Sequence, residues 1–169
     1  MSKFKIVGMV TLIAFAIGIV SMGDTVAAES GKLAFRHVLY ITTIHTLKVP
    51  DVEGHTNVLY EAKGIDFYEK WGAALFVHTN SLDLIKGAGT LQGYIYTTFP
   101  DGSTITLKFE GKSKGGGIGL TGVGSVEGTW TYTRGTGKFE GIQGRGTFNP
   151  HILGQGWVYW DLEGEYSLP

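Results

Sequence analysis

The chain has 169 residues, with 14 basic and 15 acidic side chains and a formal net charge of −1. The charges form no basic cluster, which argues against a nucleic acid as the partner. The chain has no cysteine, so disulfides, thiol catalysis and thiolate metal ligands are excluded.

The N-terminal segment has the layout of a secretory signal peptide. Lys3 and Lys5 precede an uncharged, mostly apolar run at 6–20, and a more polar stretch ends at Ala27-Ala28. A membrane-spanning helix needs about 20 apolar residues, more than this run offers. We therefore expect cleavage after Ala28, no membrane span in the mature chain, and a secreted or periplasmic location. Residues 29–169, about 140 in number, suit one domain with its own core.

The rest of the chain reads as a series of strands. Short runs rich in Val, Ile, Thr, Tyr, Phe and Trp are broken by Gly, Asp and Pro, which is typical of an all-β sandwich or barrel. A helical turn is expected near either Gly64–Lys70 or Ser81–Lys86. The eight expected strands are residues 32–48, 56–63, 71–80, 89–99, 103–112, 120–134, 142–149 and 156–167.

Side-chain alternation predicts which faces of the strands are buried. In the fifth strand Ile105, Leu107 and Phe109 share one face, and polar residues occupy the other. The same alternation in the last strand places Val158, Trp160, Leu162 and Tyr166 together.

The first strand differs because it is apolar on both faces. Strict alternation places Phe35, Leu39, Ile41 and Leu47 on one face and Val38, Tyr40 and Ile44 on the other. A strand of this kind is often buried on both faces. In a small barrel, this predicts a covered outer wall, most simply a subunit interface.

A glycine-rich hairpin separates the sixth and seventh strands. Its predicted structural residues are Gly135, Gly137, Phe139, Gly141 and Gly144. It does not match a phosphate-binding P-loop, because Gly137-Lys138 is followed by Phe rather than Ser or Thr. We therefore interpret the glycines as structural.

This hairpin, preceded by the Tyr132 strand and followed by the Gly146-Thr147-Phe148 and Gly154–Tyr166 strands, resembles the allene oxide cyclase and dirigent superfamily. The resemblance is best over residues 120–167. It implies an eight-stranded antiparallel barrel, often trimeric, with a largely apolar cavity. Members include plant cyclases, dirigent proteins that steer radical coupling, and bacterial barrels that catalyse ring-forming steps. The matching segment is structural, so no activity transfers with it.

The histidines do not predict a metal site. His37 and His45 are eight positions apart on one strand, so they share a face but lie about 27 Å apart. His45 and His55 flank a turn and could approach each other. Neither a metal nor a cofactor is predicted.

Carboxylates and aromatic residues leave two interpretations open. Glu53, Glu61, Glu127 and Asp161 lie within or beside apolar strands, where each either points inward as an acid–base group or outward into solvent. The aromatic residues either line a cavity or fill the core. They are Tyr94, Tyr96, Phe99, Trp130, Tyr132, Trp157, Tyr159 and Trp160.

The leading hypothesis is an exported all-β barrel, allene oxide cyclase-like, that binds a small apolar or aromatic molecule. The second is a cofactor-free cyclase or isomerase in which a buried carboxylate or tyrosine moves a proton. The third is a structural or interaction barrel with a filled core. A homo-oligomer, trimer or dimer, is expected. The predicted ligand-binding residues are His45, His55, Tyr60, Glu61, Tyr96, Trp130 and Tyr132.

Overall fold

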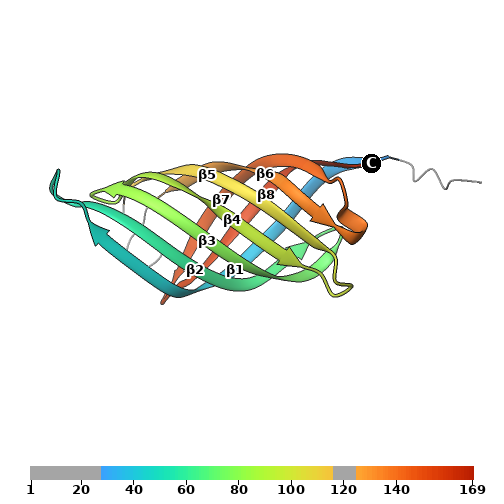
Figure 1. Cartoon of the computed structure of the whole chain (residues 1–169), viewed down its shortest axis with the longest axis horizontal. Coiled ribbons are helices and arrows are strands. Elements are labelled where there is room, and N and C mark those ends of the chain that lie inside the picture. The colour runs from blue at the N-terminus through green and yellow to red at the C-terminus, as the bar shows by residue number, and fades with distance from the viewer. Residues whose placement is uncertain (1–27, 116–124) are drawn as a thin grey trace, which may run out of the picture.

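The computed structural model describes residues 28–115 and 125–169, and the predicted signal peptide lies almost entirely outside them. Eight antiparallel strands close into a barrel in sequence order, with β1 paired to β8 (Figure 1). This confirms the predicted all-β fold. No described helix is long and apolar enough to cross a membrane. The strands are β1 Glu29–Lys48, β2 His55–Tyr68, β3 Gly72–Ile85, β4 Ala88–Thr98, β5 Thr104–Lys114, β6 Val126–Thr136, β7 Gln143–Gly154 and β8 Trp157–Leu168.

Neither segment for which a helical turn was predicted is helical. β2 continues to Tyr68 and β3 continues to Ile85, because the inward alternation of each strand continues to its end. The one helical element of the described residues is a short 3-10 turn, η1, at Gly137–Phe139 in the glycine-rich hairpin. The predicted sixth strand began at residue 120, but 120–124 lie outside the described residues.

The core lies inside the barrel, where alternate residues of each strand meet. The predicted inward residues of β5 and β8 are buried. Aromatic rings connect the strands across the interior: Phe148 stacks on Trp160 at 4.5 Å, and Phe109 meets Trp160 edge-on at 5.1 Å between ring centres. The described interior is therefore packed with rings, as a barrel of eight strands permits.

Inward glycines make room for these rings. A Cβ atom at Gly93 would lie 2.5 Å from the ring of Phe109, and one at Gly146 would lie 2.7 Å from the ring of Trp130. Both distances are too short for any real side chain. The glycines therefore let a large ring from another strand lie directly against the backbone.

A β-bulge in β1 overturns two predictions made from strict alternation. The register with β2 shifts between Ile41 and Thr43. Beyond the bulge Ile44 lies opposite buried Tyr60, whereas His45 lies opposite exposed Leu59. His37 and His45 therefore lie on opposite faces, because the extra residue reverses the alternation.

The same reversal moves Leu47 to the outer face, where its side chain is 67% exposed. The outer wall over β1–β4 also carries several exposed apolar side chains. They are Tyr40, Leu59, Ile65, Phe67, Leu75, Val77, Tyr94 and Tyr96. The subunit interface expected on this wall stays a prediction.

Candidate functional site

A buried acid–histidine pair lies at the centre of the barrel. His37 of β1 and Asp66 of β2 are register partners, and both side chains are fully buried. His37 Nδ1 lies 2.6 Å from Asp66 Oδ1. The other carboxylate oxygen accepts a hydrogen bond from the Thr97 hydroxyl at 2.8 Å, and the Tyr68 hydroxyl lies 3.4 Å from it. The carboxylate is therefore held on both oxygens by side chains from β1, β2 and β4.

A second histidine extends this pair across the sheet. His78 of β3 places its Nδ1 3.1 Å from Nε2 of His37. The ring of His78 is enclosed by Phe109 at 4.9 Å and Trp160 at 5.0 Å between ring centres. Burial, and next the charge of His37, lower the pKa of His78 well below its ordinary value. His78 is therefore neutral near pH 7.

Three buried polar atoms of this region have no hydrogen-bond partner among the described residues: His78 Nε2, Asn80 Oδ1 and the Tyr132 hydroxyl. Asn80 does donate from Nδ2 to the Tyr60 hydroxyl at 2.8 Å. A buried polar group without a partner costs about 1–3 kcal/mol, and native proteins contain few. Each of these three atoms can therefore form one further hydrogen bond.

Two tyrosines near the cluster are held in their neutral form. Burial raises the pKa of Tyr60 to about 12, against the opposing effect of its hydrogen bond from Asn80. Burial, followed by the negative charge of Asp66, raises the pKa of Tyr132 well above its ordinary value. Both phenols are therefore available as hydrogen-bond donors at neutral pH.

The three residues Asp66, His37 and His78 form a chain along which protons can shift. When His37 carries a proton on Nδ1 alone, its Nε2 accepts from Nδ1–H of His78, and His78 Nε2 is left as a base. When both nitrogens of His37 are protonated, its Nε2 donates to His78, and His78 Nε2 carries the hydrogen. The unpartnered nitrogen thus changes between acceptor and donor, as general acid–base chemistry requires.

The structure places three of the predicted ligand-binding residues in the barrel interior. Tyr60 contacts Asn80, and its ring stacks on His78 at 5.5 Å. Trp130 is 1% exposed, and its Nε1 donates to the carbonyl of Thr147. Tyr132 packs against Trp130 at 4.9 Å.

The other four predicted residues are not brought to this cluster. His45, Glu61 and Tyr96 lie exposed on the strands. His55 lies at the β1–β2 turn, where Nδ1 contacts Asp51 at 2.5 Å and Nε2 contacts Asp83 at 2.6 Å. Among the described residues no cluster of three or more acidic or histidine side chains is arranged to hold a metal.

The inward carboxylate, Asp66, is not one of the four carboxylates considered from the sequence. Glu53 and Glu61 are exposed, while Glu127 pairs with Lys114 and Asp161 with Arg36 on the outside. Asp66 instead continues the inward series of β2, but the predicted second strand ended at 63. One feature of the sequence could have identified Asp66, His37 and His78. Each is a polar residue at a strand position where the alternation calls for a buried apolar side chain.

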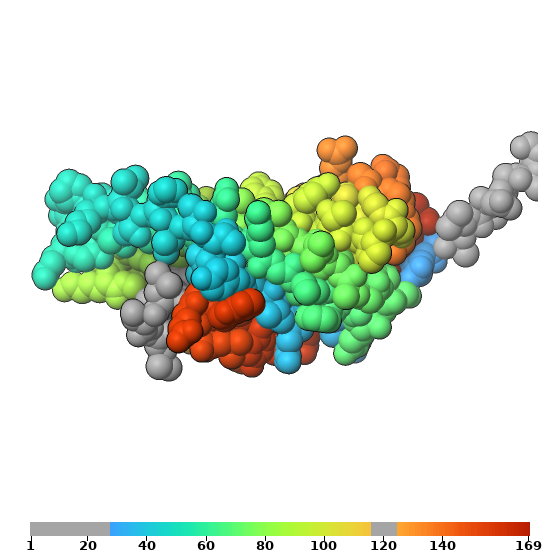
Figure 2. Space-filling view, turned by 90° about the horizontal axis from the view of Figure 1, so that it is seen from below, coloured from blue at the N-terminus to red at the C-terminus, as the bar shows by residue number. Residues whose placement is uncertain are grey.

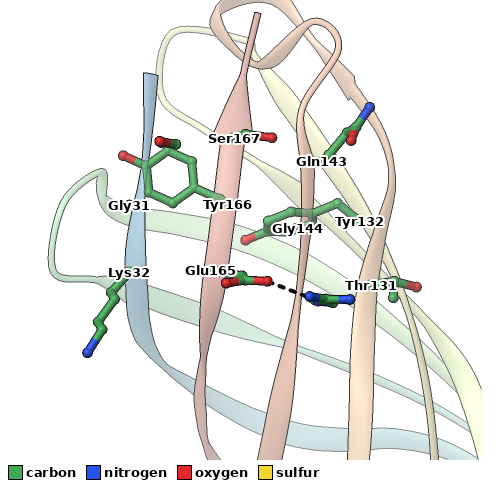
Figure 3. A pocket seen from close by; sticks show the side chains of 11 residues that line it. Gly31, Lys32, Thr131, Tyr132, Gln143, Gly144, Glu165, Tyr166 and Ser167 are labelled. Carbon is green, nitrogen blue, oxygen red and sulfur yellow. Dashed lines mark hydrogen bonds and ion pairs between the residues drawn. The ribbon is translucent and has the colours of Figure 1, made fainter. Parts of the chain in front are cut away.

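An outer groove lies where the ladder between β6 and β7 ends. Their ladder covers only Gly128–Thr131 with Arg145–Phe148. Above it, a groove of about 830 Å³ is lined by residues of β1, β6, β7 and β8, including Tyr132 and Gly144. Figure 3 shows Tyr132 beside Gly144, and a dashed line at Glu165 that marks the hydrogen bond donated by Arg145 Nε at 2.9 Å. Tyr132 therefore connects the wall of this groove with the interior.

Comparison with known protein families, with curated proteins and with solved structures found no match for this chain. The fold and the buried cluster are therefore the observations from which a function can be proposed.

Proposed function

We propose that the barrel binds a small, mostly apolar or aromatic molecule in its interior, anchored by one polar group at His78 Nε2. The observation that carries this proposal is His78 Nε2, a fully buried nitrogen without a hydrogen-bond partner among the described residues; the buried oxygens Asn80 Oδ1 and Tyr132 Oη are unpartnered too. Trp160, Phe109 and Tyr60 surround His78 with rings, which suit a flat apolar molecule.

Because the described interior is packed, the ligand must displace side chains to enter. From His78 toward the β1–β2 end, the inward residues of β3 are Asn80, Leu82 and Leu84. Aliphatic side chains change rotamer more readily than interlocked rings do, so we place entry at this end. The ligand is then small, with its polar group directed toward the middle of the barrel.

The closed eight-stranded barrel supports the resemblance of the Gly135–Gly144 hairpin to the allene oxide cyclase and dirigent superfamily. Membership of that superfamily is part of the proposal, as are export to the periplasm or the medium and assembly into a homo-oligomer. Export follows from the N-terminal charge and hydropathy pattern, and assembly from the exposed apolar outer wall.

Native mass spectrometry tests the binding proposal on the mature protein isolated from its own exported fraction. We expect a retained small molecule at fixed stoichiometry. His78→Phe removes the anchoring nitrogen and is expected to lose this molecule, whereas Tyr96→Phe, on the outer face, retains it. Simple phenols added to the purified wild-type protein give a second readout, the fluorescence of its tryptophans. If no molecule is retained and phenols leave this fluorescence unchanged, the result would support the filled structural barrel instead.

A cofactor-free isomerase or cyclase is the second candidate, and the Asp66–His37–His78 chain favours it. His78 Nε2 would take a proton from an acidic C–H or O–H of the bound molecule and return it to another atom. The proton is conserved, and no electron donor or acceptor is needed.

Deuterium incorporation into the retained molecule in D₂O tests this second candidate. Asp66→Asn should slow the incorporation and leave binding largely intact. Binding without any incorporation would reduce the function to ligand binding.

A further inference from the structure

The strand β1 extends beyond its partner β8. The β1–β8 ladder ends at Tyr40 paired with Trp157, and the Ile41 N–H makes a last hydrogen bond to the carbonyl of Gly156. Residues 43–48 then pair with β2 on one side alone, and no described residue pairs with their other side. The β1–β2 hairpin projects at the left of Figure 1, and Figure 2 shows the same end extending beyond the red β8 segment.

Alternation of the backbone identifies the unpaired groups. The Val49 N–H donates to the carbonyl of His55, so Val49 faces β2. Successive residues of a strand direct their N–H and C=O groups to opposite edges. The backbone groups of Ile44, Thr46 and Lys48 therefore point away from β2. Each has a backbone N–H and C=O without a partner among the described residues, at a spacing that another extended strand matches.

This edge lacks the features that usually prevent strands from pairing. Natural edge strands are blocked by charges, proline or bulges, yet in 42–48 the one formal charge is Lys48 at the end. The bulge lies at Thr42, at the start of this segment, and residues 43–48 beyond it pair regularly with β2. Ile44 and Leu47 are 39% and 67% exposed, so both faces of the segment carry accessible apolar surface.

We propose that this edge pairs with the same edge of a second copy of the chain, antiparallel about a two-fold axis. Only one register pairs all three residues whose backbone groups point away from β2. In it, Thr46 of one copy lies opposite Thr46 of the other, and Ile44 lies opposite Lys48. It forms about six backbone hydrogen bonds, two for each outward pair. His45 then lies opposite Leu47, so no like charges face each other. The segment is thus complementary to itself, as a two-fold interface requires.

Two substitutions at Thr46 test the pairing without disturbing the β1–β2 ladder. Thr46→Pro removes an N–H that faces away from β2, a position where an edge strand tolerates proline. Thr46→Lys keeps the N–H but places two ammonium groups opposite each other. Thr46→Val is the matched control, because it keeps the N–H and adds no charge.

Sedimentation of the mature protein over a dilution series measures the outcome. We expect a wild-type dimer, an unchanged dimer for Thr46→Val, and dissociation constants at least about tenfold higher for Thr46→Pro and Thr46→Lys. The Thr46→Lys dimer should strengthen with added salt, which screens the repulsion. Thr46→Lys also provides the test if Thr46→Pro fails to fold.

Amide hydrogen exchange identifies what covers the edge. Protection of Ile44, Thr46 and Lys48 that falls on dilution supports pairing between copies. Protection that persists in a monomer would show that the chain covers its own edge, and this overturns the proposal. A wild-type monomer at every concentration overturns it too, as does an oligomer that both Thr46→Pro and Thr46→Lys leave intact.

Discussion

The closed middle of the barrel and its projecting β1–β2 end use the same strand for opposite purposes. In the middle, β1 is hydrogen-bonded on both edges, and its His37 is fully buried against Asp66. Beyond the bulge, β1 is bonded on one edge and its side chains are exposed. One extra residue thus separates the buried polar cluster from the proposed pairing edge, because the bulge lies next to Tyr40, the residue of β1 that pairs with the first residue of β8.

The largest difference between inside and outside is expected for the tryptophans of β8. Trp160 is 3% exposed among rings, whereas Trp157 is 46% exposed on the outer wall. Trp160→Ala should lower the free energy of unfolding by about 3–5 kcal/mol, and Trp157→Ala by far less. Urea denaturation measures both. Equal losses would mean that the interior is not the packed core described.

A smaller loss is expected when the central carboxylate is neutralised. Asp66→Asn keeps the shape of the side chain but removes the charge that His37 and Thr97 contact. The free energy of unfolding should fall by about 1.5–3 kcal/mol, the range for hydrogen bonds to charged groups. Asp83→Asn is the matched control at the exposed end, and it should change global stability much less. The reverse order would place the important charge at the turn.

The hydrogen-bonded pair of Asn80 and Tyr60 either stabilises the fold or serves binding, and a double substitution distinguishes the two. Replacing both Asn80 and Tyr60, as Asn80→Leu with Tyr60→Phe, removes an unpartnered oxygen and a hydrogen bond together. Such replacements are often neutral or stabilising, so we expect a change within about 1 kcal/mol. Each single variant leaves its partner unpaired and should be less stable than the double variant. A double variant as unstable as the sum of both would show that the pair stabilises the empty barrel.

The fold could be predicted from the sequence more fully than the site. β-branched runs and turn residues gave the eight strands, and strict alternation gave the inward faces of β5 and β8. The bulge at Ile41 and Thr43 could not be predicted, because no glycine or proline marks it. His45 and Leu47 were therefore assigned to the wrong face.

The site depends on register, which no single strand encodes. Continuing the inward series of β2 past residue 63 would have reached Asp66. That Asp66 meets His37 and His78 follows only from how β1, β2 and β3 align. The turns between these strands set that alignment, and their backbone geometry could not be predicted from composition.

The contributions of His55, at the β1–β2 turn, and of His78, in the barrel interior, to stability should change with pH in opposite directions. Hydrogen bonds that His55 donates to Asp83 and then to Asp51 raise its pKa, against the opposing effect of desolvation. Its contribution is therefore complete below the unfolded pKa near 6.5 and is lost as pH rises through the folded value. Burial lowers the pKa of His78, so its contribution is complete above about 6.5 and is lost as pH falls.

Two measurements separate these effects. At the β1–β2 turn, the Lys86 N–H donates to the carbonyl of Gly54, and its protection factor, which corrects for the base-catalysed intrinsic rate of exchange, should fall above neutral pH. His55→Gln should remove this dependence. The free energy of unfolding, measured with urea, should fall as the pH is lowered. It should fall less steeply in His78→Phe than in the wild type. Because the His55 contacts are on the surface, we expect the smallest change of all in global stability there. An alkaline loss of global stability that His55→Gln abolishes would instead make the turn part of the folding core.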